Sequence, residues 1–384
     1  MSKQKILMIT PTYYPIRGGA EKVVYEMCNY LSSYYDIDLI TLDFKGSSKK
    51  NDKKENFKIH RVCREVDNKY IKFIKYQYHI HKKARELFSK NRYDLIHVHY
   101  LFPNLFTTFF LKKEFNLLVL VTEHHFGTGM DISSHKENPV YANFLMKMFA
   151  NKFEHYATTG KTQNQFLKYL GVDKSKIETI HLGGDCDISS KGKKDLYLDL
   201  KLDKSKKYIF SISRIVDRKK YDDLIEAVRI LSNIRKDIIF LVAGKGPQLE
   251  NMKKKVKKYK LNDQIKFLGF QSDKEVSKLR KVSDAFVTFS EFEGAGIMYF
   301  EAFCSNLAVF ARENVASKEA ITNNKNGFLF KTPVEFVDKL LDNIDNTKKL
   351  NSISKAGQDL FQSRYNWQRH NSKYKEYYES IIKK

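Results

Sequence analysis

Short apolar runs alternate with longer amphipathic segments along most of the chain. One series of runs lies at 5–10, 37–42, 94–99 and 117–122, and a second lies at 208–213, 238–243, 265–269, 285–289 and 307–311. Apolar runs of about four to eight residues predict buried strands, and apolar positions recurring about every three to four residues predict helices. Because strands and helices alternate, the sequence predicts an α/β protein with parallel sheets covered by helices.

The length of the chain favours two domains. It has 384 residues, and single hydrophobic cores rarely grow beyond about 250–300 residues. The segment 189–207 is polar, rich in lysine and almost without periodicity, which predicts a linker. We therefore predict an N-terminal domain over 1–188, a C-terminal domain over 208–365, and a last helical segment over 366–384.

The cysteines and the longest apolar region indicate the compartment. The chain has four cysteines, which stand far apart and form no C-x-x-C pair: Cys28, Cys63, Cys186 and Cys304. This pattern suggests neither a disulfide framework nor a zinc site. The first residues lack a signal-peptide pattern, and charges at 112–114 interrupt the apolar region 101–121, so no membrane span is predicted. We expect a cytoplasmic protein.

The charge of the chain is strongly positive. Lys and Arg total 69 against 45 Asp and Glu, a formal net charge of +24. Such a charge favours nucleic acid, an anionic membrane or phosphorylated small molecules as partners, although a general effect on solubility is the alternative. In the predicted helix 68–90, one face carries cations between tyrosines: Lys72, Lys75, His79 and Lys82. Docking to the inner face of an anionic membrane and a merely solvated helix face both stay open.

The segment 290–302, S-E-F-E-G-A-G-I-M-Y-F-E-A, carries the most specific chemical pattern. Glu293 and Glu301 are separated by seven residues, which include the turn Gly294-Ala295-Gly296. An apolar run precedes the segment and a helical one follows it, so the prediction is strand, glycine turn and helix. Glycines let a backbone approach a ligand closely, and a helix N-terminus offers N–H groups to an anion. With carboxylates that accept hydroxyl hydrogen bonds, the pattern predicts a nucleotide sugar as ligand.

The spacing E-G-x-G-x-x-x-x-E followed by Ala resembles the signature of the retaining glycosyltransferases of family four. The resemblance implies the GT-B fold, with two Rossmann-like domains facing across a cleft and a C-terminal helix crossing back to the N-domain. It also implies that the C-terminal domain holds the donor and the N-terminal domain the acceptor. Glu293 would contact the donor sugar, and Glu301 the ribose hydroxyls. The resemblance implies no metal and no cofactor beyond the donor, a nucleoside diphosphate sugar such as UDP- or GDP-hexose.

Further motifs of this resemblance lie along the whole chain. Gly18 and Gly19 follow the first strand and resemble the glycines that lie against the donor diphosphate, although a ligand-free tight turn is the alternative. The segment Val-Thr-Glu-His places His124 where the family has a histidine near the transferred sugar. Arg214 and Lys219, five residues apart before a D-x-L-I-x-A helix, resemble the phosphate-binding pair.

Two departures from the family pattern concern single turns. Lys220 replaces a glycine, which puts the exact turn in doubt but not the neighbouring cations. Asn306 stands where glycine is usual, and Asn is the next-best residue for a left-handed helix cap.

Four histidines raise the alternative of a metal site: His97, His99, His124 and His125. On a strand, the H-x-H spacing would put the rings of His97 and His99 on one face. Since no Cys, Asp or Glu cluster completes a ligand set, we predict no metal.

The predicted function is transfer of a hexose-type sugar to an acceptor hydroxyl with retention, in cell-surface or lipid-linked glycan synthesis. His124, Glu293, Arg214 and Lys219 are the predicted catalytic residues. Expected partners are the nucleotide sugar, an acceptor glycan or lipid-linked saccharide, and an anionic membrane surface, but no nucleic acid. A nucleotide-sugar epimerase or hydrolase of related fold is the alternative enzyme. A non-catalytic basic protein that binds membrane or nucleic acid is the alternative outside enzymes, and it predicts no effect of substituting the glutamates.

Overall fold

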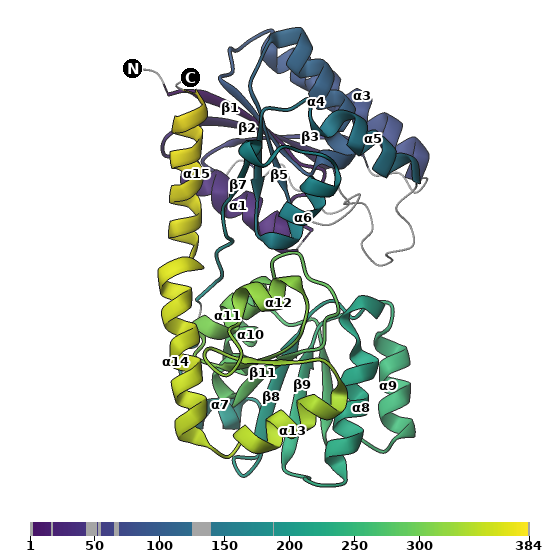
Figure 1. Ribbon diagram of the computed structural model, residues 1–384, viewed down its shortest axis with the longest axis vertical. Helices are drawn as coiled ribbons and strands as arrows, with labels where there is room; N and C mark the ends of the chain where they lie inside the picture. Colours follow the sequence, from purple (N-terminus) through teal and green to yellow (C-terminus); the bar gives the residue numbers. More distant parts are fainter. Residues whose placement is uncertain are drawn as a thin grey trace. The chain divides into compact units, whose positions relative to one another are not determined.

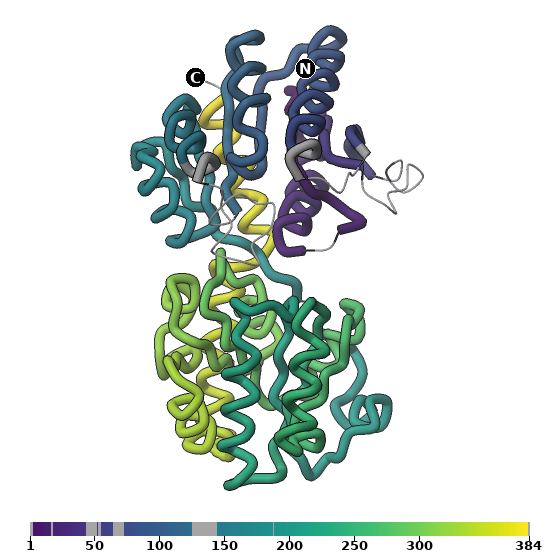
Figure 2. Tube along the Cα trace, turned by 90° about the vertical axis from the view of Figure 1, so that its right-hand side faces the viewer, coloured from purple at the N-terminus to yellow at the C-terminus, as the bar shows by residue number. Residues whose placement is uncertain are grey.

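The computed structural model describes residues 3–16, 18–43, 52, 55–64, 69–124, 140–186 and 188–382, without the side chains of 64, 69–72 and 140–143. The chain divides into two compact units. Unit 1 contains Met1–Leu182 and Trp367–Lys384, and unit 2 contains Gly183–Asn366. Both ends of the chain therefore lie in unit 1 (Figure 2).

Unit 1 is built on a parallel sheet of seven strands in the order β3-β2-β1-β4-β5-β6-β7. The strands are β1 (Lys5–Ile9), β2 (Asp36–Asp43), β3 (Lys58–Arg64), β4 (Leu95–His99), β5 (Val119–Glu123), β6 (His155–Thr158) and β7 (Ile177–Thr179). Apart from Lys5 at the start of β1, the strands β1, β4 and β5 are buried, which explains why they appear in the sequence as apolar runs.

Helices cover both faces of this sheet (Figure 1). One face carries α1 (Gly19–Leu31) and α15 (Trp367–Ile382), and the other carries α3 (Lys69–Phe88), α4 (Leu101–Phe115), α5 (Val140–Ala150) and α6 (Lys161–Tyr169). A short 3₁₀ turn, Lys174–Lys176, precedes β7. Each face thereby buries its own apolar cluster against the sheet.

The C-terminal helix α15 belongs to unit 1, which confirms the predicted return of the chain to the N-domain. Its tyrosines form hydrogen bonds to the middle of the sheet. The Tyr378 hydroxyl lies 2.5 Å from Nδ1 of His97, and the Tyr374 hydroxyl lies 2.9 Å from Oγ1 of Thr122. Because these groups are buried, their hydrogen bonds fix how α15 lies on the strands.

Unit 2 contains a second parallel sheet, of six strands in the order β10-β9-β8-β11-β12-β13. The strands are β8 (Lys207–Ile212), β9 (Ile238–Ala243), β10 (Ile265–Gly269), β11 (Ala285–Thr288), β12 (Ala308–Arg312) and β13 (Phe328–Phe330). One face packs against α8 (Tyr221–Ser232), α9 (Leu249–Lys258) and α13 (Pro333–Asn343). The remaining helices are α7 (Lys193–Asp199), α10 (Asp273–Val282), α11 (Ile297–Cys304), α12 (Val315–Ala320) and α14 (Thr347–Arg364), with a 3₁₀ turn at Asp217–Lys219.

Both sheets reverse their strand order in the middle, as Rossmann-like domains do. The reversal lies between β1 and β4 in unit 1 and between β8 and β11 in unit 2. Ligands of open α/β sheets bind outside the carboxyl ends of the strands at such a reversal. The fold therefore directs attention to the loops after β1 and β4, and to those after β8 and β11.

The prediction of a linker over 189–207 is wrong, because this segment contains helix α7. Leu196 and Tyr197 of this helix are buried, and the Tyr197 hydroxyl donates to the carbonyl oxygen of Val282, 3.2 Å away. Two buried residues thus anchor a helix within a segment, 189–207, in which lysine is the commonest residue. The chain divides between Leu182 and Gly183, six residues before the predicted boundary at 188.

A disulfide joins Cys186 and Cys304, so the expectation of no disulfide is wrong for this pair. Their Cα atoms lie 5.4 Å apart, a usual separation for a disulfide, although 118 positions separate them in the sequence. The bond ties the segment that opens unit 2 to the last residue of α11. Neither Cys28 nor Cys63 forms a disulfide with another described residue.

Candidate active site

Two loops at the carboxyl edge of the unit 2 sheet carry most of the predicted site. The first loop joins β8 to α8 and contains Arg214 and Lys219, and the second joins β11 to α11 and contains Glu293. A backbone hydrogen bond of 3.0 Å from Glu291 N to Arg218 O ties the loops together. The fold thus brings together residues that are 74 positions apart.

Lys219 and Glu293 form a buried ion pair. The Lys219 ammonium donates to Oε1 of Glu293, and the two side chains are only 8% and 9% exposed. The Arg218 guanidinium lies 3.9 Å from Oε2 of Glu293 and donates to the carbonyl oxygen of Phe292 at 3.1 Å. Burial alone would raise the pKa of Glu293, but the charges of Lys219 and Arg218 outweigh it and hold that pKa below its ordinary value.

The glycine turn before α11 needs glycine at one position. Gly296 adopts φ 72°, in the left-handed region, at the N-terminus of α11. A Cβ atom there would lie 2.3 Å from the ring of Tyr299. Gly294 and Ala295 complete the turn between Glu293 and the helix, as the sequence predicts.

Glu301, which lies further along α11, is also held by a cation. Arg280 of α10 donates through Nη2 to Oε2 of Glu301, and their side chains are 7% and 16% exposed. The sequence gives no signal for Arg280, because it lies on a lysine-rich helix and its partner is 21 positions away. Arg218 was also missed, although it directly precedes the predicted Lys219.

Arg214 differs from Lys219 because its side chain is exposed. Within the described parts of the chain it forms no ion pair, so its guanidinium can meet an anionic ligand. The predicted pair therefore consists of one exposed cation and one buried cation.

The two departures from the family's glycines both adopt left-handed backbone. Lys220 has φ 49° and ψ 47° immediately before α8, and its ammonium lies 3.0 Å from Oε2 of Glu291. Asn306 has φ 56° just after α11, as predicted for a left-handed cap. The turn at 220 is therefore kept without glycine.

The remaining predicted residues lie in unit 1. Gly18 is exposed and immediately precedes α1, which begins at Gly19. A Cβ atom on Gly18 would lie 2.4 Å from Oε2 of Glu21. Glu21 is buried, and this burial raises the pKa of its carboxyl. Glu21 was not among the predicted site residues, although it lies only two positions after Gly19.

His124 is part of a buried cluster of histidines. Its Nε2 lies 2.8 Å from Nδ1 of His99, and the two rings are stacked at 5.1 Å. The rings of His97 and His99 lie 4.4 Å apart, so the H-x-H spacing does place them on one face of the strand. His370 of α15 is buried in the same unit and forms a 2.8 Å hydrogen bond to the His181 carbonyl. His125 lies outside the described residues.

Burial has a common electrostatic effect on this cluster. It lowers the pKa of His97, His99 and His370, because a desolvated imidazolium is unfavourable. In the described segments, no three His, Cys, Asp or Glu side chains gather in a way that could hold a metal ion.

The predicted site residues thus fall into two groups. Unit 2 holds Arg214, Lys219, the segment Glu293–Gly296 and Glu301, while unit 1 holds Gly18, Gly19 and His124. The unit 2 residues, like Gly18 and Gly19, follow strands at the reversal of strand order, whereas His124 follows β5, one strand further from the reversal.

Comparison with known proteins accounts for both units. The model "Glycosyltransferase Family 4" matches residues 17–188, and the model "Glycosyl transferases group 1" matches residues 196–360. An uncharacterized glycosyltransferase of Methanocaldococcus jannaschii is 23% identical over 100% of both chains. The alpha-monoglucosyldiacylglycerol synthase of Streptococcus pneumoniae is 22% identical over 90% of this chain and 80% of that protein.

A solved structure supports the fold. The Anabaena protein HepE in complex with UDP and glucose aligns with a TM-score of 0.80 and 18% identity, covering 98% of this chain and 100% of that chain. The family models together span most of the sequence, in the order of the two sheets. The chain therefore belongs to the family-four glycosyltransferases, with the GT-B fold of two Rossmann-like domains.

Proposed function

We propose that the protein transfers a hexose-type sugar from a nucleoside diphosphate donor to an acceptor hydroxyl, with retention at the anomeric carbon. The observation that carries this proposal is the cluster at the carboxyl edge of the unit 2 sheet. There, carboxylates that can bind hydroxyls and cations that can bind phosphates lie on two joined loops and on the helix that follows. A nucleotide sugar needs both kinds of group.

The donor's leaving group would be stabilised by the cations of unit 2. Negative charge grows on the diphosphate as the glycosidic bond breaks, and preorganised donors stabilise that charge. Arg214 is exposed and ready to contact a phosphate oxygen. The Lys219 ammonium has three donors, so its contact with Glu293 leaves others for a phosphate. Backbone N–H groups around Gly294 and Gly296 would add hydrogen bonds.

The carboxylates and the unit 1 residues would bind the remaining parts of the substrates. Glu293 would accept hydroxyls of the donor sugar while it holds Lys219 in place. Glu301 would accept the ribose hydroxyls. Gly18 and Gly19 would lie against the diphosphate, and His124 would lie near the transferred sugar. No metal or further cofactor enters this proposal.

The relatives support a nucleotide sugar donor and a lipid or glycan acceptor. The Streptococcus pneumoniae relative is a glucosyldiacylglycerol synthase, and the Anabaena structure holds UDP and glucose. We propose for this chain an acceptor in cell-surface or lipid-linked glycan synthesis. The transferred sugar would be a hexose carried on UDP or GDP.

A donor and acceptor screen tests the proposal. The protein is incubated with UDP- and GDP-hexoses, with and without candidate lipid and glycan acceptors, and released nucleoside diphosphate is measured. We expect release that depends on the acceptor, and a product whose anomeric configuration, read by NMR, equals that of the donor. Inversion would exclude the retaining mechanism. Turnover without an acceptor would favour the alternative epimerase or hydrolase.

Peripheral attachment to an anionic membrane is part of the proposal, and it rests on one face of unit 1. The adjacent helices α3, α4 and α5 expose large apolar side chains: Ile74, Tyr78, Phe110, Phe144 and Met148. Lys75 and Lys82 of the predicted basic face are also exposed, whereas the side chain of Lys72 lies outside the described residues. Exposed apolar groups beside lysines are typical of surfaces that bind anionic lipid.

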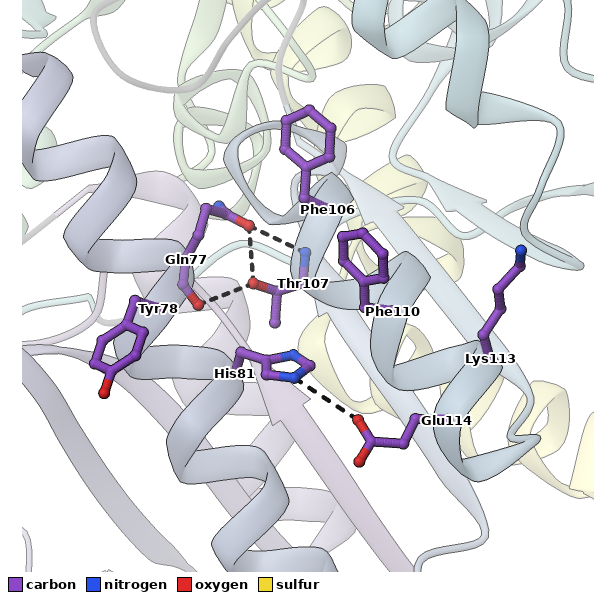
Figure 3. Close-up of a pocket in the computed structure, with 8 residues that line it drawn as sticks. All are labelled: Gln77, Tyr78, His81, Phe106, Thr107, Phe110, Lys113 and Glu114. Carbon is purple, nitrogen blue, oxygen red and sulfur yellow. Dashed lines mark hydrogen bonds and ion pairs between the residues drawn. The ribbon is translucent and has the colours of Figure 1, made fainter.

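A groove between α3 and α4 lies in this face (Figure 3). Its volume is about 550 Å³, and Tyr78 and Phe110 flank a floor where Gln77 hydrogen-bonds Thr107. No helix within the described ranges is long and apolar enough to cross a membrane. Sedimentation with anionic and neutral vesicles tests the attachment. Binding to both kinds alike, or unchanged binding of a Lys75→Glu/Lys82→Glu variant, would contradict it.

A further inference from the structure

The ion pair between Arg280 and Glu301 joins two neighbouring helices of unit 2. Arg280 lies near the end of α10 and Glu301 lies in the middle of α11. The arginine side chain is 7% exposed, whereas 16% of the glutamate side chain is exposed. The cation is therefore almost fully enclosed behind a carboxylate that solvent still reaches.

Among the described residues, hydrogen-bond donors reach only one oxygen of this carboxylate. Nη2 of Arg280 donates to Oε2 of Glu301, and within the described residues no hydrogen bond reaches Oε1. A carboxylate oxygen offers about two acceptor positions. Oε1 is thus left for a ligand, while Oε2 fixes the direction in which the carboxylate points.

A buried ion pair of this kind contributes little to the stability of a fold. Because both ions lose water, replacing such a pair with apolar residues is often neutral or even stabilising. The Arg280–Glu301 pair is better explained by a functional need for the Glu301 carboxylate at this position on α11. A carboxylate beside a nucleoside diphosphate would otherwise repel the phosphates, and the guanidinium offsets that charge.

From this geometry we infer that Arg280 is a positioning residue for nucleotide recognition. It holds the Glu301 carboxylate so that Oε1 accepts a hydrogen bond from the ribose of the donor. The inference rests on the proposed function, which assigns ribose recognition to Glu301. Arg280 itself need not touch the nucleotide, since it acts through the carboxylate.

The shape of the guanidinium matters in this role. Its planar fork directs its donors, whereas a lysine ammonium is a flexible point charge. Arg280→Lys should therefore retain the charge but only part of the orientation. Arg280→Met should lose both and leave Glu301 free to rotate.

Selectivity for ribose measures this role without any assay of sugar transfer. Binding of UDP, GDP and ADP is compared with that of their 2′,3′-dideoxy forms by calorimetry. Hydrogen bonds to a charged group contribute about 1.5–3 kcal/mol, so the wild type should bind the ribose form roughly 10- to 100-fold more tightly. We expect this ratio to fall to about threefold or less in Glu301→Gln and Arg280→Met, and to an intermediate value in Arg280→Lys.

Matched controls separate this role from a structural one. Arg235 forms ion pairs with Asp237 and Asp345 elsewhere in unit 2, so Arg235→Met removes a comparable arginine without touching Glu301. Its ribose selectivity should equal that of the wild type. Thermal unfolding identifies any variant that is not folded at the binding temperature, and Arg280→Lys supplies the test if Arg280→Met is unfolded.

The outcomes distinguish the two levels of inference. Selectivity lost in Glu301→Gln but kept in the Arg280 variants would overturn the role of Arg280 alone. Selectivity kept in Glu301→Gln would overturn the ribose role of Glu301, and the role of Arg280 with it. Absence of binding of all three nucleoside diphosphates to the wild type would overturn the proposed function as well.

Discussion

The Lys219 ammonium lies against the Glu293 carboxylate, with both side chains more than nine-tenths buried. In the sequence these residues belong to separate motifs with separate roles. In the structure they are one electrostatic unit, which Arg218 joins from 3.9 Å. Removing either partner leaves a buried charge without its main counter-charge, so we expect a single substitution at this pair to alter stability as well as activity.

The first prediction concerns this coupling. Lys219→Met should destabilise unit 2 by about 3–5 kcal/mol, because it leaves Glu293 buried without its main counter-charge. The double variant Lys219→Met/Glu293→Gln should be more stable than the Lys219→Met variant, since Glu293 is then uncharged and the remaining Arg218 is partly exposed to water. Urea unfolding of the wild type, both single variants and the double variant completes the cycle. Additive losses would show that the two residues act independently.

Arg214 should behave differently, because its side chain is exposed. Arg214→Ala should lower turnover by about 10²–10³-fold, the usual loss on removing one donor to a developing anion. The urea midpoint of unfolding of this variant should equal that of the wild type within error. Lys245→Ala is the control, because it also removes one positive charge from an exposed side chain, in the neighbouring β9–α9 loop. Near-normal turnover of the Arg214 variant would remove it from the site.

Lys220 tests whether the turn before α8 is strained. A non-glycine residue in the left-handed region destabilises the folded state by about 1–2 kcal/mol. Glycine avoids this strain, but it loses more conformational freedom on folding, which costs roughly 0.5–1 kcal/mol. Lys220→Gly should therefore be more stable than Lys220→Ala by up to about 1 kcal/mol. Both variants lose the exposed ion pair with Glu291, so comparing their urea midpoints isolates the backbone. Equal midpoints would show that the turn carries no strain.

The sequence predicts those parts of the fold that depend on local pattern. Buried strands appear as apolar runs, and the D-x-L-I-x-A helix predicted after Lys219 is α8. The predicted unit 2 residues lie on the carboxyl side of their sheet because strand, loop and helix follow one another directly in the chain. The left-handed cap at Asn306 was also predictable, since it depends on one residue.

The parts that could not be predicted depend on contacts between distant positions. Arg280 pairs with Glu301 across 21 positions, and His99 contacts His124 across 25. Neither pair leaves a spacing pattern in a single sequence. Helix α7 was missed because the segment 189–207 is rich in lysine, and only Leu196 and Tyr197 of the helix are buried.

The disulfide between Cys186 and Cys304 gives a prediction about redox state. A bond that closes so long a loop restricts the unfolded chain and typically contributes about 2–4 kcal/mol. The urea midpoint of the wild type should therefore fall when dithiothreitol is added. The Cys186→Ser/Cys304→Ser variant should have a lowered midpoint that is the same with and without dithiothreitol, and Cys63→Ser serves as the control. If dithiothreitol did not change the urea midpoint of the wild type, the disulfide between Cys186 and Cys304 would not form in the protein.

The last prediction concerns His370 and the stability of unit 1 in mild acid. Burial lowers the pKa of His370 from 6.5 to about 4, because the folded chain cannot hydrate its charged form. At a pH between these two pKa values, His370 is mostly protonated in the unfolded chain and mostly neutral in the folded chain. Stability is therefore complete above about pH 6.5 and falls as the pH falls toward 4, by roughly 3 kcal/mol from this group alone.

Substitution of His370 separates this effect from that of the other buried histidines. His370→Asn can keep a donor to the His181 carbonyl but does not titrate, whereas His97 and His99 stay in both proteins. Urea unfolding at pH 7.5 and pH 4.5 should show that the wild type loses about 2–3 kcal/mol more than the variant over this range. His79→Asn is the control, because that ring lies partly exposed on α3 outside the cluster. An equal loss in the wild type and the His370 variant would mean that the folded protein accepts the proton at His370, which the burial of this side chain within unit 1 argues against.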